Sequence, residues 1–313
     1  MEENIIAVAD LGTNTFQYLI TKVNLEGQQI LFEQQDAVKL GEGGINKGMI
    51  QPEPFARGIM SMQKFADLVA AFGANPVRAI ATSALRNADN GQVFINTVQA
   101  KTGIAIELIS GEEEAKYIYK GILASGCLTD ENSLIIDIGG GSVELIIGNK
   151  QGIIWKQSFE IGCARLMDTF HKIDPIPDAN IATLNHYLDS SLSALFAALK
   201  NDSVLNLIGS SGSFETFALL LELQKGRALD IKTETSYRFD LNQLQVLLNQ
   251  IIKSSHTERA NNKGIIPVRV DMLVSAALIT RYILEKLDIK NVEMTTNSLK
   301  EGVLFDMLGA KSL

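Results

Sequence analysis

The sequence predicts a duplicated α/β fold with two lobes and a cleft between them. Residues 10–17 and 137–144 are two versions of one octet, set 127 residues apart, and each lies between two apolar runs typical of strands. An order of strands followed by helices begins at the first octet and restarts at the second. The chain has 313 residues, which is enough for about two domains of ordinary size.

The first 125 residues are expected to begin with strands and to continue with helices. Pro52 precedes the first helical pattern and Gly73 follows it, as is typical of helix ends. The chain then crosses into a second lobe at Ser125 and Gly126. The expected strands are 5–10, 16–23, 28–37 (with Gly27 at the turn), 77–81 and 104–109, and the expected helices are 53–72, 88–102 and 111–124.

The second half repeats this order. Its expected strands are 133–138, 143–148, 152–159, 204–208 and 291–295, and its expected helices are 178–199, 212–225, 240–252, 270–287 and 297–309.

Composition narrows the functional class. The net charge of −8 argues against a general nucleic-acid binder, which needs a basic face. No apolar run approaches the roughly 20 residues that span a bilayer, and the N-terminus has no signal-type pattern, so we expect no membrane partner and a cytoplasmic location. Two cysteines and three histidines provide neither a disulfide framework nor a Cys/His metal array. A phosphate-rich substrate would have to be bound by local basic groups and Mg²⁺.

The two octets carry the most informative chemistry. Each has an aspartate at the end of a strand, then a turn rich in glycine and hydroxyl groups, then a polar residue on the returning strand. Backbone amides of such a turn can bind a phosphate, and the aspartate can hold Mg²⁺. A single hairpin of this kind is often only a tight turn. Two at matching register predict facing lobes that hold a phosphate chain between them.

Glu114 is the acidic residue that local structure explains least. It lies in a run of three glutamates at a predicted helix start, where the helix dipole favours acidic side chains. Glu113 fits a capping box with Ser110, and Glu112 has Lys116 four residues on. Glu114 instead lies on the apolar side of the helix. There its carboxylate is expected to be poorly hydrated, with a pKa raised toward the range of a general base; the alternative is a solvated helix-start glutamate.

Three further features remain open between binding and ordinary structure. The segment 209–213 follows an apolar run and opens a helix, which is an anion-binding geometry but also a common turn. Arg86 ends a short buried strand, where α/β proteins bind ligands, yet a surface arginine is the alternative. Five other basic residues are mostly interpreted as surface charges: Lys39, Lys47, Arg259, Lys263 and Arg269. No nucleophilic triad is evident, which favours metal-assisted attack by water.

Together these motifs resemble the exopolyphosphatase / guanosine pentaphosphate phosphohydrolase (Ppx/GppA) family, within the superfamily of actin-like and sugar-kinase-like ATPase folds. The resemblance runs nearly from end to end, and the segment containing Glu114 together with the second octet is its most specific part. The residues that carry it are Val8–Phe16, Lys39–Gly43, Ala81–Arg86, Ile109–Ala115, Ile136–Glu144, Gly209–Phe214 and Ser298–Leu304.

The resemblance implies a duplicated ribonuclease H-like fold in which the last helix returns to the first lobe. The lobes would then comprise residues 1–125 with 297–313, and residues 126–296. It also implies site roles: Glu114, Asp137 and Glu144 as catalytic residues, and Asp10, Asp137 and Glu144 near Mg²⁺. The implied phosphate-binding residues are Thr13, Asn14, Thr15, Arg86, Gly139, Gly140, Gly141 and Ser142, with Gly209, Ser211, Gly212 and Ser213 from the third loop.

The sequence departs from this family at three cationic positions. Gln17 and Lys300 stand where the family usually has arginine, and Lys39 replaces another frequent arginine. Lysine loses the bidentate phosphate contact, and glutamine loses the charge. The resemblance also leads us to expect a short member, without the appended helical domains of longer relatives. These differences bear on the binding of long chains more than on the chemistry.

The sequence therefore predicts an Mg²⁺-dependent exopolyphosphatase that removes the terminal phosphate of inorganic polyphosphate, with Glu114 as the base. The nearest alternative is a guanosine pentaphosphate 5′-phosphohydrolase. An alternative of another class is a non-hydrolytic nucleotide or phosphate sensor, and a kinase is a third. A homodimer is implied by the resemblance only.

Overall fold

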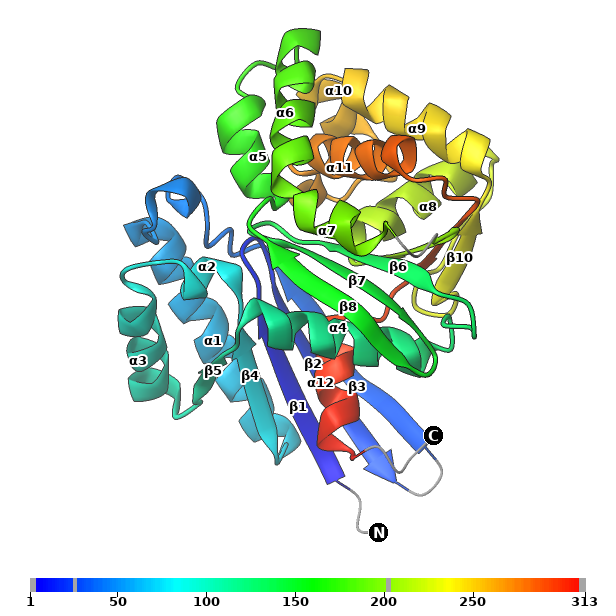
Figure 1. The fold of residues 1–313 in the computed structure, drawn as a ribbon. Helices are drawn as coiled ribbons and strands as arrows, with labels where there is room; N and C mark the ends of the chain where they lie inside the picture. The colour runs from blue at the N-terminus through cyan, green and yellow to red at the C-terminus, as the bar shows by residue number, and fades with distance from the viewer. Residues whose placement is uncertain (1–3, 25–26, 201–203, 310–313) are drawn as a thin grey trace.

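The structure is a computed structural model that describes residues 4–24, 27–200 and 204–309 (Figure 1). Its first sheet has the order β3-β2-β1-β4-β5, in which β1 is antiparallel to β2 and parallel to β4. The elements of this part are β1 (Asn4–Leu11), β2 (Phe16–Asn24), β3 (Gly27–Asp36), α1 (Pro52–Phe72), β4 (Val77–Ala81), α2 (Ser83–Arg86), α3 (Gly91–Thr102), β5 (Ile106–Leu108) and α4 (Gly111–Ser125).

The second sheet repeats this topology. Its order is β10-β11-β9-β6-β7-β8, so that β6, β7, β8, β9 and β11 correspond to β1 to β5 in pairing and direction. The strands are β6 (Ser133–Ile138), β7 (Val143–Asn149), β8 (Gly152–Phe159), β9 (Asn206–Ser210), β10 (Ser236–Phe239) and β11 (Asn291–Thr295). The helices are α5 (Cys163–Phe170), α6 (Asp178–Ser191), α7 (Ser193–Ala198), α8 (Gly212–Gln224), α9 (Leu241–Lys253), α10 (His256–Asn261), α11 (Leu273–Lys286) and α12 (Leu299–Met307). The predicted duplicated, two-lobed ribonuclease H-like fold is confirmed.

Helices α4 and α12 form a layer between the two sheets (Figure 1). Their apolar side chains share one core with the facing sides of both sheets, whereas α1 and α3 cover the outer face of the first sheet and α5 to α9 and α11 cover that of the second. The two central helices approach so closely that a Cβ at Gly302 would overlap the carbonyl of Tyr117. The division into lobes at 125 and 297 stays a prediction, and its residues 1–3 and 310–313 lie outside the described residues.

Strand alternation directs the octet residues inward. In β1 the side chains of Ala7 and Ala9 pack in the outer core, and those of Ile6 and Val8 pack in the central core. Asp10 lies on the same face of β1 as Ile6 and Val8, because successive side chains of a strand point to opposite faces. The same alternation in β6 places Ile135 in the central core and Asp137 in line with it. Both aspartates therefore reach the space between the sheets at the ends of their strands.

Several secondary-structure predictions need correction. Residues 178–199 form two helices, and near the break the Ser190 hydroxyl donates to the Tyr187 carbonyl, which competes with the helical pattern. The predicted strand 204–208 lies at Asn206–Ser210. Short elements α2, α5, α10 and β10 were not predicted, because segments of four to eight residues carry little periodicity of their own. Within the described residues, no helix combines the length and apolar character of a membrane span.

Candidate active site

The two octet turns have the same backbone geometry. In the first, the Gly12 amide donates to the Thr15 carbonyl at 3.0 Å, and in the second the Gly139 amide donates to the Ser142 carbonyl, also at 3.0 Å. A Cβ on Gly12 or Gly139 would lie 2.9 or 3.0 Å from that same carbonyl oxygen, so the tight turn needs glycine at both positions. The repeated sequence pattern therefore reflects a repeated structure.

Each turn is supported from behind by backbone donors. The carbonyls of Thr13 and Asn14 accept from the amides of Gly41 and Lys39 at 3.0 and 2.7 Å. The glycine-rich loop that begins at Lys39 thus fixes the orientation of the first turn.

The second turn is supported by the start of α5. The Gly139 and Gly140 carbonyls accept from the amides of Cys163 and Ala164 at 2.9 and 2.8 Å. Because the carbonyl and amide groups of a trans peptide plane point in opposite directions, these bonds direct the amides of the turn away from α5. In the described part of the chain, the amides of Gly140 and Gly141 have no hydrogen-bond partner. They are free to bind an anion.

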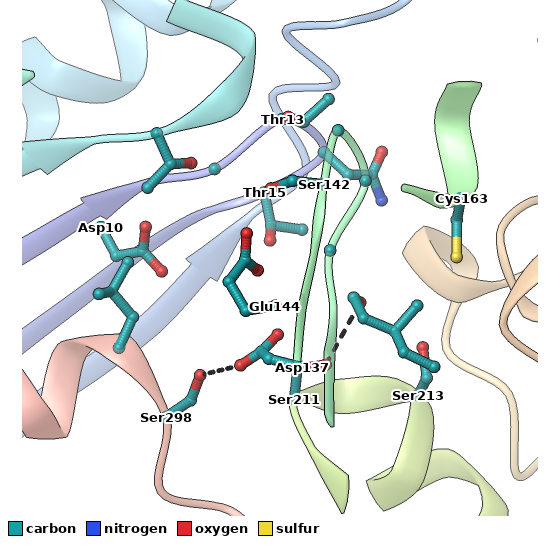
Figure 2. Close-up of a pocket in the computed structure, with 18 of the residues that line it drawn as sticks. Asp10, Thr13, Thr15, Asp137, Ser142, Glu144, Cys163, Ser211, Ser213 and Ser298 are labelled. Carbon is teal, nitrogen blue, oxygen red and sulfur yellow. Dashed lines mark hydrogen bonds between the residues drawn. The ribbon is translucent and has the colours of Figure 1, made fainter. Parts of the chain in front are cut away.

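The turns meet at one cavity. A Cβ on Gly140 would lie 3.2–3.3 Å from side-chain atoms of Thr13 and Asn14, so the two turns pack directly against each other. Beside them lies a cavity of about 90 Å³ (Figure 2). It is lined by Asp10, Gly12, Thr13, Asn14, Thr15, Gln17, Thr82, Glu114, Ile118, Asp137, Ile138, Gly139, Gly140, Gly141, Ser142, Glu144, Cys163, Ser211, Ser213, Arg269, Met272, Ser298 and Leu299.

Asp10 is held in an environment that favours protonation. It is 8% exposed, and burial, followed by repulsion from Asp137, raises its pKa to about 7. Gln17, its cross-strand partner, donates to Oδ2 at 3.5 Å, while the buried Oδ1 has no hydrogen-bond partner among the described residues. A buried carboxylate oxygen without a donor is suited to a cation.

Asp137 and Glu144 face the same cavity (Figure 2). Ser298 of the α12 N-terminus and Ser210 of β9 donate to Asp137 Oδ2 at 2.7 and 2.9 Å, and Ser158 donates to Glu144 Oε1 at 2.6 Å. Burial nevertheless raises the pKa of both carboxyls, and the nearby Glu114 raises that of Glu144 further. The cavity therefore concentrates negative charge that needs a cation or protons to balance it.

Glu114 is buried as the helix pattern predicted. It is 6% exposed in the first turn of α4, and burial raises its pKa to about 8 despite the opposing effect of Arg86. The Arg86 Nη1 donates to Glu114 Oε2 at 3.0 Å. The capping box of Ser110 and Glu113 is present. Glu112 pairs with Lys156 of β8 in place of the predicted Lys116. Glu114 is thus the glutamate of the run that reaches the cavity.

The carboxylates fit Mg²⁺ in one particular way. Among the described residues, no group of three or more His, Cys, Asp and Glu side chains is placed to hold a single metal ion. The unpartnered Oδ1 of Asp10 is a suitable ligand, since Mg²⁺ is commonly bound through one or two carboxylates and completed by water and substrate phosphate. The residues therefore fit a magnesium ion held by Asp10 with water and phosphate. The contact of Asp137 and Glu144 with Mg²⁺, directly or through water, stays a prediction.

Most of the predicted site residues line the cavity, but some do not. Gly209 and Gly212 are outside the lining, and packing explains both, because a Cβ would overlap the Phe214 ring at Gly209 and the Arg269 guanidinium at Gly212. Arg86 also lies outside the lining and donates a hydrogen bond to Glu114, which does line the cavity. Ser211 and Ser213 do line the cavity, and so do the two octet turns. Their roles in phosphate binding stay predictions.

The cationic candidates have different surroundings from those expected. Lys39 pairs with Asp271 at 2.9 Å, and the buried Lys300 pairs with Glu301 and Glu33 at 2.6 and 3.3 Å. Arg269, one of the five basic candidates named above, is the basic residue in the cavity lining. It is the last residue of a single turn of 3₁₀ helix, Pro267–Arg269, and burial lowers the pKa of its guanidinium. No local sequence signal distinguished Arg269 from the other basic residues.

Comparison with known proteins adds an independent observation. The model of the Ppx/GppA phosphatase family matches residues 19–311. The chain belongs to this family. Membership identifies it as a phosphoanhydride hydrolase and confirms the resemblance on which the site roles were expected.

Individual relatives agree with this assignment. A crystal structure described as an exopolyphosphatase from Cytophaga hutchinsonii is 38% identical, with a TM-score of 0.95 over 98% of each chain. A putative exopolyphosphatase of Haemophilus influenzae is 27% identical over 96% of this chain and 91% of its own length. A guanosine-5'-triphosphate,3'-diphosphate pyrophosphatase of Pseudoalteromonas atlantica is 28% identical to this chain. The alignment covers 98% of this chain and 59% of that relative.

Proposed function

We propose that this protein is an Mg²⁺-dependent exopolyphosphatase that removes the terminal phosphate of inorganic polyphosphate. The observation that carries the proposal is a small cavity in which buried carboxylates lie beside two anion-binding turns. Its volume of about 90 Å³ is well below the roughly 300–1,000 Å³ of sites for drug-sized ligands. A terminal phosphoryl group is small enough to enter, and its oxygens match the amides of the turns.

Glu114 is proposed as the general base. A base that removes a proton from water works best when its pKa lies near the working pH, and burial raises the pKa of Glu114 to about 8. Arg86 bonds Glu114 from outside the cavity and fixes the position of its carboxylate. Attack by water on the terminal phosphorus would break the bond to the bridging oxygen, and the proton taken from water would reside on Glu114.

The remaining lining residues would stabilise the charge that develops. The amides of Gly140 and Gly141, the hydroxyls of Thr13 and Ser142, and the Arg269 guanidinium would face the phosphoryl oxygens. Bound Mg²⁺ would supply neutralisation of those oxygens. In its absence, the carboxylates of Asp10, Asp137 and Glu144 would repel an anionic substrate, since the cavity lining contains four acidic residues and one basic residue.

The relatives support inorganic polyphosphate as the first candidate substrate. Two relatives that this chain matches over most of their length, the Haemophilus influenzae protein and the Cytophaga hutchinsonii structure, carry exopolyphosphatase in their names. The guanosine-5'-triphosphate,3'-diphosphate pyrophosphatases also match nearly all of this chain, at 26–28% identity, and they support guanosine pentaphosphate 5′-phosphohydrolysis as the second candidate. The chain spans about 60% of their length, so part of each has no counterpart here.

A phosphate-release assay separates these readings. Polyphosphate of several chain lengths and guanosine pentaphosphate would be compared, each with Mg²⁺ and with a chelator. We expect Mg²⁺-dependent release that is faster from polyphosphate. Faster release from guanosine pentaphosphate would favour the second candidate. Binding without turnover of either substrate would favour the phosphate sensor, and formation of ADP from ATP with an acceptor would favour a kinase.

A further inference from the structure

Beside the cavity, an acidic side chain occupies a cluster of groups that would suit a phosphate. Glu160 follows β8, and its Oε2 accepts from Ser83 Oγ at 2.7 Å and from Arg165 Nη2 at 2.8 Å. Its Oε1 accepts from Arg86 Nη2 at 3.4 Å. Partial burial raises the pKa of Glu160, but the hydrogen bonds from Ser83 and Asn87 and the two arginines lower it overall, so the carboxylate is charged at neutral pH.

The two arginines are held in place without Glu160. Arg165 donates from Nε to the Gly141 carbonyl at 2.8 Å and from Nη1 to the Ile45 carbonyl at 3.0 Å. Arg86 donates from Nη1 to the Ile109 carbonyl at 3.1 Å as well as to Glu114. Their side chains are only 15% and 19% exposed. The cationic part of the cluster is therefore preorganised.

Glu160 is the least constrained member. Its side chain is 42% exposed, whereas the residues on either side, Phe159 and Ile161, are buried at 6% and 2%. The backbone is thus anchored, and rotation of one side chain is enough to vacate the cluster. Because the Glu160 carboxylate is partly solvated, its ion pairs are weaker than fully buried ones, and another anion can compete with it for the two arginines.

The cluster adjoins the cavity through shared residues. Arg86 bonds Glu114, and Arg165 bonds Gly141, and both of these partners line the cavity. Ser83 directly follows Thr82, which also lines it. The cluster thus lies next to the place where the terminal phosphate would bind, on the side of Glu114 and the second turn.

We propose that Arg86, Arg165 and Ser83 form a second phosphate subsite, and that Glu160 is a tethered anion which longer polyphosphate chains must displace. The inference rests on the proposed function and specifies how that site distinguishes substrates. Arginine pairs bind carboxylate and phosphate oxygens with the same geometry, so one group can replace the other. A diphosphate confined to the cavity would leave Glu160 in place. A chain that extends into the cluster would compete with it.

The test compares Glu160→Gln with the wild type and with a matched control, Glu107→Gln. Glu107 is also an exposed carboxylate bound by an arginine, Arg78, at 3.0 Å with 47% exposure, and its substitution changes the net charge equally. Binding of pyrophosphate and of long-chain polyphosphate would be measured by calorimetry with Mg²⁺, with each protein carrying Glu114→Gln so that turnover is too slow to interfere. Phosphate release with Mg²⁺ would be measured in parallel, and folding would be checked by thermal unfolding.

We expect Glu160→Gln to tighten the binding of long-chain polyphosphate roughly fivefold, the equivalent of one exposed charge pair, with little change for pyrophosphate. Glu107→Gln should change neither. Equal changes for both ligands, no change, or weaker binding of the long chain would overturn the subsite and leave Glu160 a structural contact. If the protein hydrolyses polyphosphate but Glu160→Gln leaves the ratio of long-chain to pyrophosphate affinity unchanged, only this inference is refuted. If Glu160→Gln changes that affinity ratio but the protein hydrolyses neither polyphosphate nor pyrophosphate, only the proposed function is refuted.

Discussion

Replacing Glu114 by glutamine tests the proposed chemistry most directly. Glutamine keeps the shape of the side chain and can accept the hydrogen bond from Arg86, but it cannot take a proton from water. General bases contribute roughly a hundred- to ten-thousand-fold to rate, so kcat should fall by about that factor. The fold should remain intact, because the substitution removes a charge that burial disfavours.

The pH dependence of the wild type provides a second magnitude. With a pKa of about 8 for Glu114, roughly one molecule in ten has the ionised base at pH 7. The kcat/KM for phosphate release should therefore rise with pH up to about 8, close to tenfold for each unit well below the pKa, and the residual activity of Glu114→Gln should lack this rise. Glu113→Gln is the control, since glutamine also serves in the capping box that Glu113 forms.

Phosphate release would be followed by a continuous phosphate assay between pH 6 and 9, with circular dichroism to confirm folding. Turnover of Glu114→Gln within about threefold of the wild type would refute the role of Glu114 as base, because that loss is too small for general-base catalysis. A rise with pH that persists in the variant would show that another group titrates.

Three further predictions concern stability and binding. Gly302→Ala should lower the free energy of unfolding in urea by about 1–3 kcal/mol, because the added Cβ overlaps the Tyr117 carbonyl where α4 and α12 cross. The control Gly152→Ala, whose Cβ meets open space, should leave stability unchanged. Equal stability of the two variants would contradict the close packing of the helices. Without metal, thermal stability should decrease as pH rises from about 4 to about 7, because Asp10 retains a proton in the folded protein that it has released in the unfolded chain. Mg²⁺ should restore stability at pH 7 in the wild type but not in Asp10→Asn. A wild-type stability that does not change with pH would contradict the raised pKa of Asp10. Arg269→Met should lower kcat/KM roughly ten- to a hundredfold, consistent with loss of one charged hydrogen bond in the cavity; unchanged kinetics would place Arg269 outside substrate binding.

Much of the fold could be predicted from local patterns. The octets, the strand alternation and most of the longer helices are properties of short segments, so their places along the chain follow from the sequence. Glu114 was identified in the same way, because its neighbours in the helix leave it on the apolar face. The short helices α2 and α5 were not predictable on that basis, because their residues are fixed by contacts with distant segments, such as the bonds from Cys163 and Ala164 to the second turn.

The site was predicted less completely than the fold. Arg269 and Glu160 are ordinary charged residues in the sequence, and their importance comes from contacts with other elements; Glu160, for example, accepts a hydrogen bond from Ser83, which lies 77 positions earlier. The sequence also suggested binding roles for Gly209 and Gly212, where the structure provides a steric reason for glycine. Lys39 and Lys300 likewise have acidic partners that no local pattern indicated.

By itself, the sequence determined that two similar hairpins each carry an inward-facing aspartate, since a strand fixes the side on which every second residue lies. Only the tertiary structure decided that both hairpins close on one cavity, and that Glu114 and Arg269 face it from other elements. The physical reason is that burial and electrostatic coupling depend on distances between segments far apart in the chain. Those distances set the pKa values and the charge balance on which the proposed chemistry depends.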